Sequence, residues 1–326
     1  MILSRRSLLA AAGVGTATLA APRFAFAAKP TEIRLDWAYY NPVSLILKED
    51  RLLETALAAD GIAVRWVQSA GSNKALEFLS AGSLDFGSTA GAAALLGKIN
   101  GNPIKSIYVF SRPEWTALVA RKDSAVQSVA DLKGRSVAVT RGTDPHIFLV
   151  RAIAEAGLGA KDVRFVLLQH ADGMTALARG DVDAWAGLDP MMAQAELEHG
   201  ARLFHRNKGN NTWGVLNVRE AFAAEHPDLV ARVLKAYETA RATALANPAR
   251  LQSLLAAQAK LPEAVIARQL GERTELTHSA IGAAQADTIV AAGLALQEGG
   301  VIKPDVDIRA VVKSLIDDRF NAALRS

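Results

Sequence analysis

Hydrophobic and polar positions follow two different periods along the first two thirds of the chain. Short apolar runs that suit buried strands alternate with segments whose apolar residues recur every three or four positions, as in amphipathic helices. The predicted strands span residues 33–37, 63–68, 85–88, 104–110, 117–121, 136–140, 163–168, 184–188, 202–205 and 214–218. The predicted helices span residues 45–58, 73–81, 90–99, 146–156, 173–179 and 191–199. This alternation predicts an α/β fold with parallel strands joined by right-handed crossovers.

The last third of the chain has a helical pattern almost throughout. Residues 221–319 read as helix, interrupted at His226-Pro227, Asn247-Pro248, Leu261-Pro262 and Lys303-Pro304. A chain of 326 residues is long enough to divide into two lobes, each with its own core. Strand spacing, together with the family resemblance described below, places one crossing between the lobes near residues 112–121 and a second near residues 210–218, which would return the chain to the first lobe.

The N-terminus has the three parts of an export signal. A twin-arginine pattern, Ser4-Arg5-Arg6-Ser7-Leu8-Leu9, precedes an uncharged run over residues 8–21, and Ala25-Phe26-Ala27 matches a cleavage site. The uncharged run is too short and too weakly apolar to span a membrane. We therefore predict a signal peptide over residues 1–27, export through the twin-arginine machinery, and a periplasmic protein that begins near Ala28.

Composition excludes several classes of function. Removal of residues 1–27 leaves 34 basic and 33 acidic side chains, with no clustered basic patch, so nucleic-acid binding is not expected. The chain has no cysteine, which rules out disulfides and thiolate metal sites. It contains no G-x-S-x-G, no P-loop and no G-x-G-x-x-G after a strand. We expect neither an enzyme nor a bound cofactor or metal.

Four predicted strands end in turns that suit the start of a helix. Asn41, Asp144 and Asp189 each precede a proline, an arrangement typical of a capped helix with proline in its first turn. Ser88 and Thr89 offer hydroxyl caps at the fourth turn. Helix N-termini attract anions, and open α/β sheets bind ligands beyond the carboxyl ends of their strands. The turns therefore predict a polar cleft that accepts an anion, if they converge.

Five further motifs cover most of the mature chain. They are Ala81-Gly-Ser-Leu-Asp-Phe-Gly-Ser-Thr89, Ser128-Val-Ala-Asp-Leu-Lys-Gly-Arg-Ser-Val-Ala-Val139, Gly142-Thr143 with His146, Gly180-Asp-Val-Asp-Ala-Trp185 with Asp189-Pro190, and Ala221-Phe-Ala-Ala-Glu-His-Pro227. Their order and spacing over residues 31–320 resemble the periplasmic substrate-binding proteins of ABC importers for aliphatic sulfonates, taurine and nitrate, most of all the aliphatic sulfonate branch. The resemblance implies a two-lobed periplasmic-binding-protein fold of type II with the ligand cleft between the lobes. Lobe 1 would hold residues 28–114 and 215–326, and lobe 2 residues 115–214.

The resemblance also implies a set of ligand contacts. It places them on Ser88, Thr89 and Ala90 in lobe 1, on Gly142, Thr143 and His146 in lobe 2, and on Asp189 before its proline. Leu188 stands where relatives often have tryptophan, and Asp144 where many have an uncharged residue. A carboxylate repels a sulfonate, so either Asp144 is an N-cap turned away from the pocket or the ligand also carries an amine.

The residues themselves suggest other contacts. Tyr39, Tyr40 and Asn41 follow the first strand, where the tyrosines could wall an apolar pocket for the tail of the ligand. Trp213 precedes the proposed return strand and suits either the core or the ligand. His146, in a first helical turn, could donate to an oxyanion or simply be exposed. The remaining histidines show no metal-ligand spacing and are expected at the surface or at helix caps: His170, His199, His205, His226 and His278.

These observations predict the periplasmic component of an ABC importer, a monomer that closes its lobes on a small organic oxyanion without turnover. The ligand would be an aliphatic or aryl sulfonate, taurine, a sulfate ester or nitrate, delivered to a membrane permease. One alternative is an enzyme or binding protein of pyrimidine or cofactor-precursor metabolism on the same fold, although twin-arginine export argues against that role. Another is a periplasmic sensing subunit for a membrane kinase.

Overall fold

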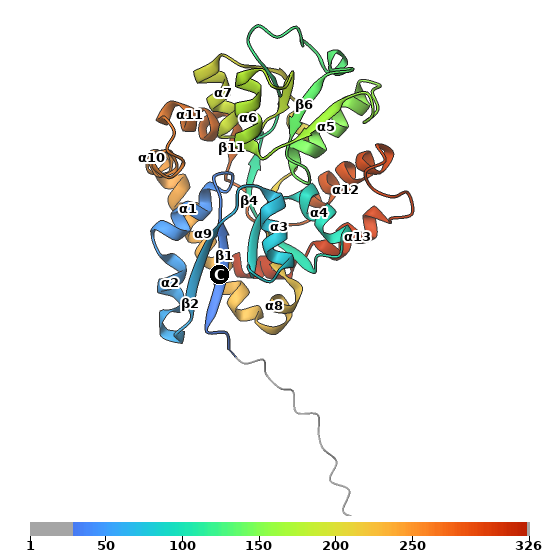
Figure 1. Cartoon of the computed structure of the whole chain (residues 1–326). Helices are drawn as coiled ribbons and strands as arrows, with labels where there is room; N and C mark the ends of the chain where they lie inside the picture. Colours follow the sequence, from blue (N-terminus) through green and yellow to red (C-terminus); the bar gives the residue numbers. More distant parts are fainter. Residues whose placement is uncertain (1–28, 325–326) are drawn as a thin grey trace, which may run out of the picture.

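The computed structural model describes residues 29–324, which form two β-sheets with helices packed around each (Figure 1). The first sheet has the order β11-β4-β10-β3-β1-β2. Its strands are β1 (Glu32–Trp37), β2 (Ala63–Gln68), β3 (Phe86–Ala90), β4 (Ile104–Pro113), β10 (Gly214–Arg219) and β11 (Thr274–Glu275). Strand β1 runs parallel to β2 and β3, whereas β10 is antiparallel to β3 and β4. Helices α1 (Pro42–Glu49), α2 (Leu52–Leu57), α3 (Ser72–Ser80) and α4 (Gly91–Ile99) connect the first four strands.

The second sheet has the order β7-β6-β8-β5-β9. Its strands are β5 (Leu118–Ala120), β6 (Ser136–Val139), β7 (Arg164–Leu167), β8 (Ala184–Ala186) and β9 (Arg202–His205). Strand β6 is parallel to β7 and β8, and β5 is antiparallel to β8 and β9. Helices α5 (Asp144–Glu155), α6 (His170–Arg179) and α7 (Met191–His199) cover it.

The C-terminal third is helical and packs largely on the first sheet and its helices. It comprises α8 (Glu220–Glu225), α9 (Pro227–Ala246), α10 (Pro248–Ala259), α11 (Glu263–Ala267), α12 (Ala283–Glu298) and α13 (Ile308–Leu315). Helix α9 packs against α1 and α2, and α12 and α13 pack against α4. Among residues 29–324, no helix is both long and apolar enough to cross a membrane.

The two sheets are connected by residues 114–117, between β4 and β5, and by residues 206–213, between β9 and β10. We call the first sheet with its helices and the C-terminal helices lobe 1, and the second sheet with α5–α7 lobe 2. We propose that the lobes divide at residues 114/115 and 214/215. Apolar side chains join them. Ile147 and Val150 of α5 pack in the core around α4 and α12, Ala193 of α7 packs against α1, α10 and α11, and Leu188 packs in the large core of lobe 1.

The structure differs from the sequence-based prediction in several places. The predicted helix over residues 45–58 begins at Pro42 and is two helices, because Arg51 has a left-handed backbone with φ of 52°. The prediction that Ser88 and Thr89 cap a helix is wrong. Both residues belong to β3, and Ala90 is the N-cap of α4. Helices α5 and α6 begin two and three residues earlier than predicted. The predicted signal peptide lies outside the described residues.

Candidate functional site

A small cavity lies where the two lobes meet. Its volume is about 10 Å³, and its lining comes from lobe 1, the first connecting segment and lobe 2: Tyr40, Ser72, Trp115, Thr143, Asp144, Pro145, His170 and Leu188. Ser72, Asp144 and His170 are the first residues of α3, α5 and α6. The N–H groups of a first helical turn have no partner within the helix, so α3 and α6 can supply donors from both lobes. Helix α5 supplies fewer, because Pro145 has no N–H and the His146 N–H donates to the Thr143 carbonyl at 3.1 Å. Of the predicted site residues, Tyr40, Thr143 and Asp144 meet here.

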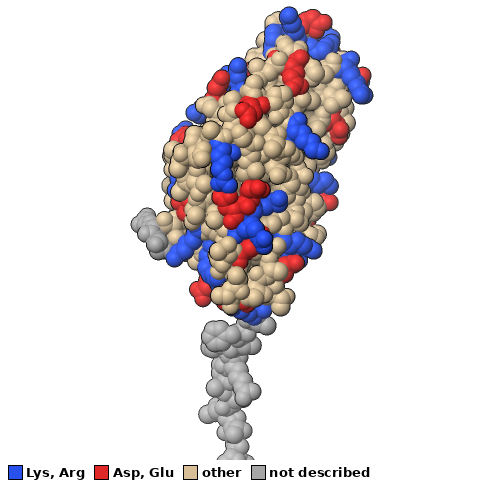
Figure 2. Space-filling view, turned by 90° about the vertical axis from the view of Figure 1, so that its left-hand side faces the viewer, with Lys and Arg blue, Asp and Glu red and all other residues tan. Residues whose placement is uncertain are grey.

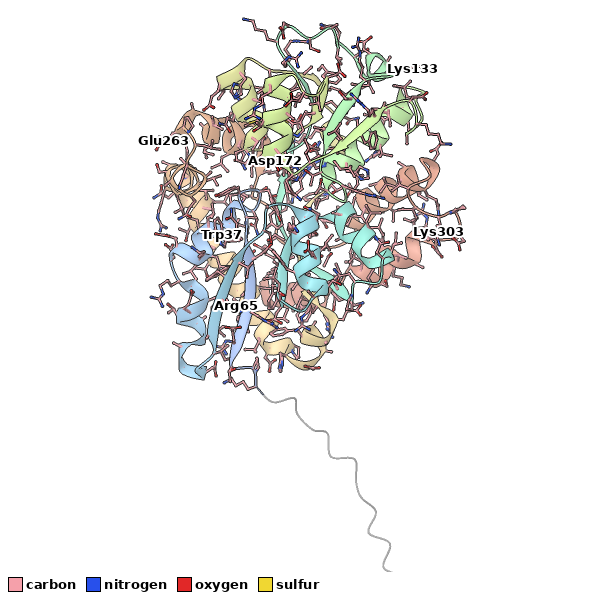
Figure 3. All side chains as sticks on the ribbon, in the orientation of Figure 1. Trp37, Arg65, Lys133, Asp172, Glu263 and Lys303 are labelled. Atoms are coloured by element: carbon pink, nitrogen blue, oxygen red, sulfur yellow. The ribbon has the colours of Figure 1, made fainter. Side chains whose placement is uncertain are left out.

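A wider groove of about 1130 Å³ adjoins this cavity between the lobes. Lobe 1 lines it with α3, α4 and the segment 300–306, which includes Lys303 (Figure 3). Lobe 2 contributes Arg141, Gly142, His146, Phe165 and Leu167. Gly142 immediately precedes the cavity residue Thr143, so the groove opens beside the cavity. The predicted residues Gly142 and His146 therefore lie in the groove.

Asp144 is buried and hydrogen-bonded to both connecting segments. Its carboxylate accepts hydrogen bonds from Trp115 Nε1 (2.8 Å), Thr212 N (3.0 Å) and Thr212 Oγ1 (2.7 Å). Burial raises its pKa, although these three donors oppose the shift. Asp144 is the first residue of α5 and Thr143 is the N-cap, so the expected capping role of Asp144 is wrong. An amine on a ligand would have to compete with three donors already in place.

A hydrogen-bond network inside lobe 1 holds Tyr40 at the cavity. The Tyr40 hydroxyl donates to the Ser88 carbonyl (2.9 Å), and Asn41 Nδ2 donates to Ser88 Oγ (2.7 Å). Ser88 donates its Oγ to Asp36 (2.8 Å) and its N–H to the same carboxylate (2.9 Å). Burial raises the pKa of Asp36 to about 6. The polar groups of Asn41 and Ser88 are thus used within lobe 1.

Three other predicted contacts also have partners in lobe 1. Thr89 Oγ1 accepts a hydrogen bond from Asn217 Nδ2 at 2.8 Å. The backbone N–H of Ala90 donates to Ser72 Oγ at 3.0 Å and so positions a cavity residue. The Tyr39 hydroxyl donates to the carbonyl of Gln258 at 3.0 Å, and Tyr39 is not among the residues that line the cavity or the groove.

Asp189 forms a buried ion pair between the lobes. Its carboxylate lies 3.1 Å from Arg273 Nη1, and both side chains are 1% exposed. Arg273 also pairs with Glu196 of α7, and the Asp189 carboxylate accepts the N–H of Ala193 at 3.0 Å. Desolvation raises the pKa of Asp189 to about 6 against the opposing effect of Arg273. Asp189 thus joins lobe 2 to the chain segment that leads into β11.

Trp213 lines a third space, on a different set of elements. Its neighbours there include Arg112, which lies over the indole ring at 5.2 Å, and His278, whose ring is 4.9 Å away. The space measures about 380 Å³ and shares no lining residue with the cavity or the groove. The side chain of Trp213 therefore lines neither the cavity nor the groove.

Two histidines lie at first helical turns facing the space between the lobes. His146 is 8% exposed, packs edge-on to Phe165 and has no hydrogen-bond partner at Nδ1. Burial lowers its pKa to about 4. His170, expected at the surface or as a cap, is instead 1% exposed and lines the cavity. Burial lowers the pKa of His170 to about 3, so both imidazoles are neutral near pH 7.

Five of the eight cavity residues were not among the predicted contacts: Ser72, Trp115, Pro145, His170 and Leu188, although Leu188 was noted in place of a tryptophan that relatives often have. His170 and Ser72 had a usable signal, because each follows a predicted strand by a few residues and starts a helix, as Asp144 does. Trp115 lies in a connecting segment without periodicity. Only the fold shows that this indole reaches the carboxylate of Asp144.

Comparisons with known proteins show which family the chain belongs to. The sequence model of the NMT1/THI5-like family matches residues 57–251. A protein of Escherichia coli (strain K12) whose name assigns it to aliphatic sulfonate binding is 29% identical over 295 residues, which cover 89% of this chain and 92% of the relative. A taurine-binding periplasmic protein of the same organism is 26% identical over 197 residues, 58% of this chain and 59% of the relative.

Solved structures show the same two-lobed fold. The alkanesulfonate-binding protein SsuA from Xanthomonas axonopodis pv. citri, bound to MOPS, has a TM-score of 0.80 at 26% identity and covers 89% of this chain and 99% of its own. The periplasmic aliphatic sulphonate binding protein SsuA from Escherichia coli has a TM-score of 0.73 at 28% identity, with 86% and 91% covered. The predicted fold class and the predicted resemblance to aliphatic sulfonate-binding proteins are confirmed. The chain belongs to the NMT1/THI5-like family.

Proposed function

We propose that this chain is the periplasmic solute-binding component of an ABC importer that captures an aliphatic or aryl sulfonate, or a similar small oxyanion, and delivers it to a membrane permease. The observation that carries the proposal is the cavity between the lobes, where the first turns of α3, α5 and α6 meet. Helix N-termini offer backbone donors and a favourable field to an anion. The names of the relatives support a sulfonate as that anion.

Capture would require movement of the lobes. A cavity of about 10 Å³ is about the minimum that holds one water, so a sulfonate head group must enter while the lobes are further apart. Closure then surrounds the head group with groups from both lobes, and the adjoining groove of about 1130 Å³ can take a tail. The groove surface includes Phe165, Leu167 and Val301, which suits an alkyl or aryl tail.

We further propose that the ligand leaves unchanged. Besides Tyr40, two cavity residues carry a hydroxyl, and each has a partner in the protein. Ser72 Oγ accepts a hydrogen bond from the Ala90 N–H, and Thr143 Oγ1 donates to the carbonyl of Thr140 at 2.6 Å. Neither is hydrogen-bonded to a histidine in the part of the chain that the structure describes, and a hydroxyl–histidine pair is one arrangement that activates such a nucleophile.

Calorimetry and a thermal-shift screen test the proposal with the mature chain. The panel contains alkyl and aryl sulfonates, taurine, sulfate esters, nitrate, pyrimidine precursors and neutral sugars. We expect at least one sulfonate to bind with a binding free energy of about −8 kcal/mol or more favourable, a micromolar Kd, and to raise Tm. Mass spectrometry should recover that ligand unaltered. Saturation by a neutral sugar with no response to any sulfonate would contradict the proposal.

A further inference from the structure

His170 has two polar atoms in a buried place without partners. It is the first residue of α6, directly beyond β7, and 1% of it is exposed. Neither Nδ1 nor Nε2 has a hydrogen-bond partner among the described residues. A buried polar atom without a partner costs free energy, and native proteins rarely retain one without a reason. The side chain lies on the cavity wall, where a bound ligand could be the missing partner.

The imidazole faces the other lobe. A Cβ added to Gly71, the N-cap of α3, would lie 3.0 Å from His170 Nε2 and 3.2 Å from Cδ2. The absence of a side chain at Gly71 therefore lets the ring approach the N-terminus of a lobe 1 helix. The ring lies between the starts of α3 and α6, where the helix dipoles disfavour a positive charge. This placement agrees with the neutral form of His170 that burial favours, with a pKa of about 3.

The described residues that line the cavity include no lysine and no arginine. Their one formal charge is the carboxylate of Asp144, whose two oxygens already accept hydrogen bonds from Trp115 and Thr212. Within the cavity an anion is therefore neutralised by N–H and O–H dipoles, whereas the cations Arg141 and Lys303 line the adjoining groove. Such a site suits one negative charge, because each further charge would be buried without a counter-ion.

We infer that His170 is a ligand-binding residue whose neutral imidazole donates a hydrogen bond to a singly charged head group, and that the cavity selects such head groups over dianions. A sulfonate meets this requirement, since it is a monoanion whose three oxygens only accept. This inference rests on the proposed function and adds the residue and the charge that set its specificity.

The test compares variants and ligands by calorimetry at pH 8.5. His170→Phe keeps an aromatic ring but removes both nitrogens, and His170→Gln keeps a donor. The matched control is His199→Phe, because His199 is an exposed residue in the last turn of α7. For ethanesulfonate we expect His170→Phe to weaken binding about tenfold or more, the size of one lost hydrogen bond to a charged group, while His170→Gln loses less and the control does not change.

Ethylphosphonate has the same tail and is mostly, though not wholly, the dianion at this pH, so it should bind wild-type protein several-fold more weakly than ethanesulfonate, and its affinity should fall further as the pH rises. Equal binding of the two ligands would overturn the charge selection, and unchanged sulfonate binding by His170→Phe would overturn the role of His170. Wild-type protein that binds no sulfonate at all would instead contradict the proposed function.

A measurement on wild-type protein covers the case in which His170→Phe does not fold. In NMR spectra of protein labelled with ¹⁵N-histidine, the imidazole signal of His170 is identified as the one that is absent from His170→Gln. In wild-type protein this signal should shift when ethanesulfonate is added. The shift should saturate with the calorimetric Kd. An unchanged signal at saturation would overturn the contact.

Discussion

Replacement of Asp144 by alanine should destabilise the protein strongly, because one carboxylate on α5 binds both segments that connect the lobes. The change leaves Trp115 Nε1 and the backbone N–H of Thr212 buried without an acceptor, whereas the Thr212 hydroxyl can rotate to another one. Each orphaned donor costs about 1–3 kcal/mol, so we expect the free energy of unfolding to fall by about 2–6 kcal/mol. Urea unfolding at pH 7, followed by circular dichroism, measures the change.

Two variants separate this effect from the loss of charge. Asp144→Asn keeps one acceptor oxygen, and its amide can donate to Thr212 Oγ1, so it should cost clearly less than Asp144→Ala. Asp172→Ala removes an exposed carboxylate from the first turn of α6, the next helix of lobe 2 along the chain (Figure 3), where the loss is limited to about 0.3–1 kcal/mol of helix-dipole interaction. If Asp144→Ala unfolds within about 1 kcal/mol of wild type, the three hydrogen bonds contribute no net stability and the reasoning fails.

Three further predictions follow from buried or charged groups. The pKa of Asp36 in the folded protein is raised to about 6, so folding favours its protonated form. As the pH rises from about 4 to 6, the free energy of unfolding of wild-type protein should therefore fall relative to that of Asp36→Asn, by at most about 3 kcal/mol. Parallel profiles of unfolding free energy against pH for the two proteins would refute this. Arg273→Met leaves Asp189 buried without its partner, so the free energy of unfolding in urea should fall by about 3–5 kcal/mol. Adding Asp189→Asn to the same chain should restore part of this stability. A double variant no more stable than Arg273→Met alone would contradict the pairing. Replacement of Arg5 and Arg6 by lysine should leave uncleaved precursor in the cytoplasm on an immunoblot, whereas continued export would indicate the general secretory route.

Most of the fold was predictable because its elements carry strong local signals. The strand at 136–140 and the helix after it show buried apolar runs bounded by glycine and proline, and α9 and α10 begin at the prolines that mark them. Strand β11 was not predicted, because two residues paired with the end of β4 leave no pattern in the sequence. The break at Arg51 was also missed, since arginine gives no hint of a left-handed backbone.

The candidate site was predictable only in part, because it is made by two lobes. Sequence shows that Thr143 and Asp144 lie at the start of a helix after a strand, but not that Ser72 and Tyr40 face them from the other lobe. The sequence also does not show in which direction a side chain points. Ser88 was expected to cap a helix, yet it lies in β3 and its hydroxyl donates to Asp36 within lobe 1.

The charged residues of the site could also not be identified from the sequence. The nearly balanced composition predicts no basic patch, and Figure 2 shows acidic and basic side chains interspersed over the face in view. The charges that matter for the site are the few that are buried. Asp144 and the Asp189–Arg273 pair lie at contacts between the lobes or at their connections, where sequence gives no measure of burial.

The unpaired imidazole of His170 also bears on how binding is coupled to closure. In a closed form without ligand, each buried nitrogen that lacks a partner costs about 1–3 kcal/mol, which favours separation of the lobes. A sulfonate that accepts a hydrogen bond from this ring removes part of that cost only when the lobes are together, so its affinity for the closed form exceeds its affinity for the open form. A ligand shifts a conformational equilibrium by no more than this difference in affinity. The side chain that we assign to head-group selection would therefore also favour closure of the liganded protein, the form that the proposed permease would have to recognise.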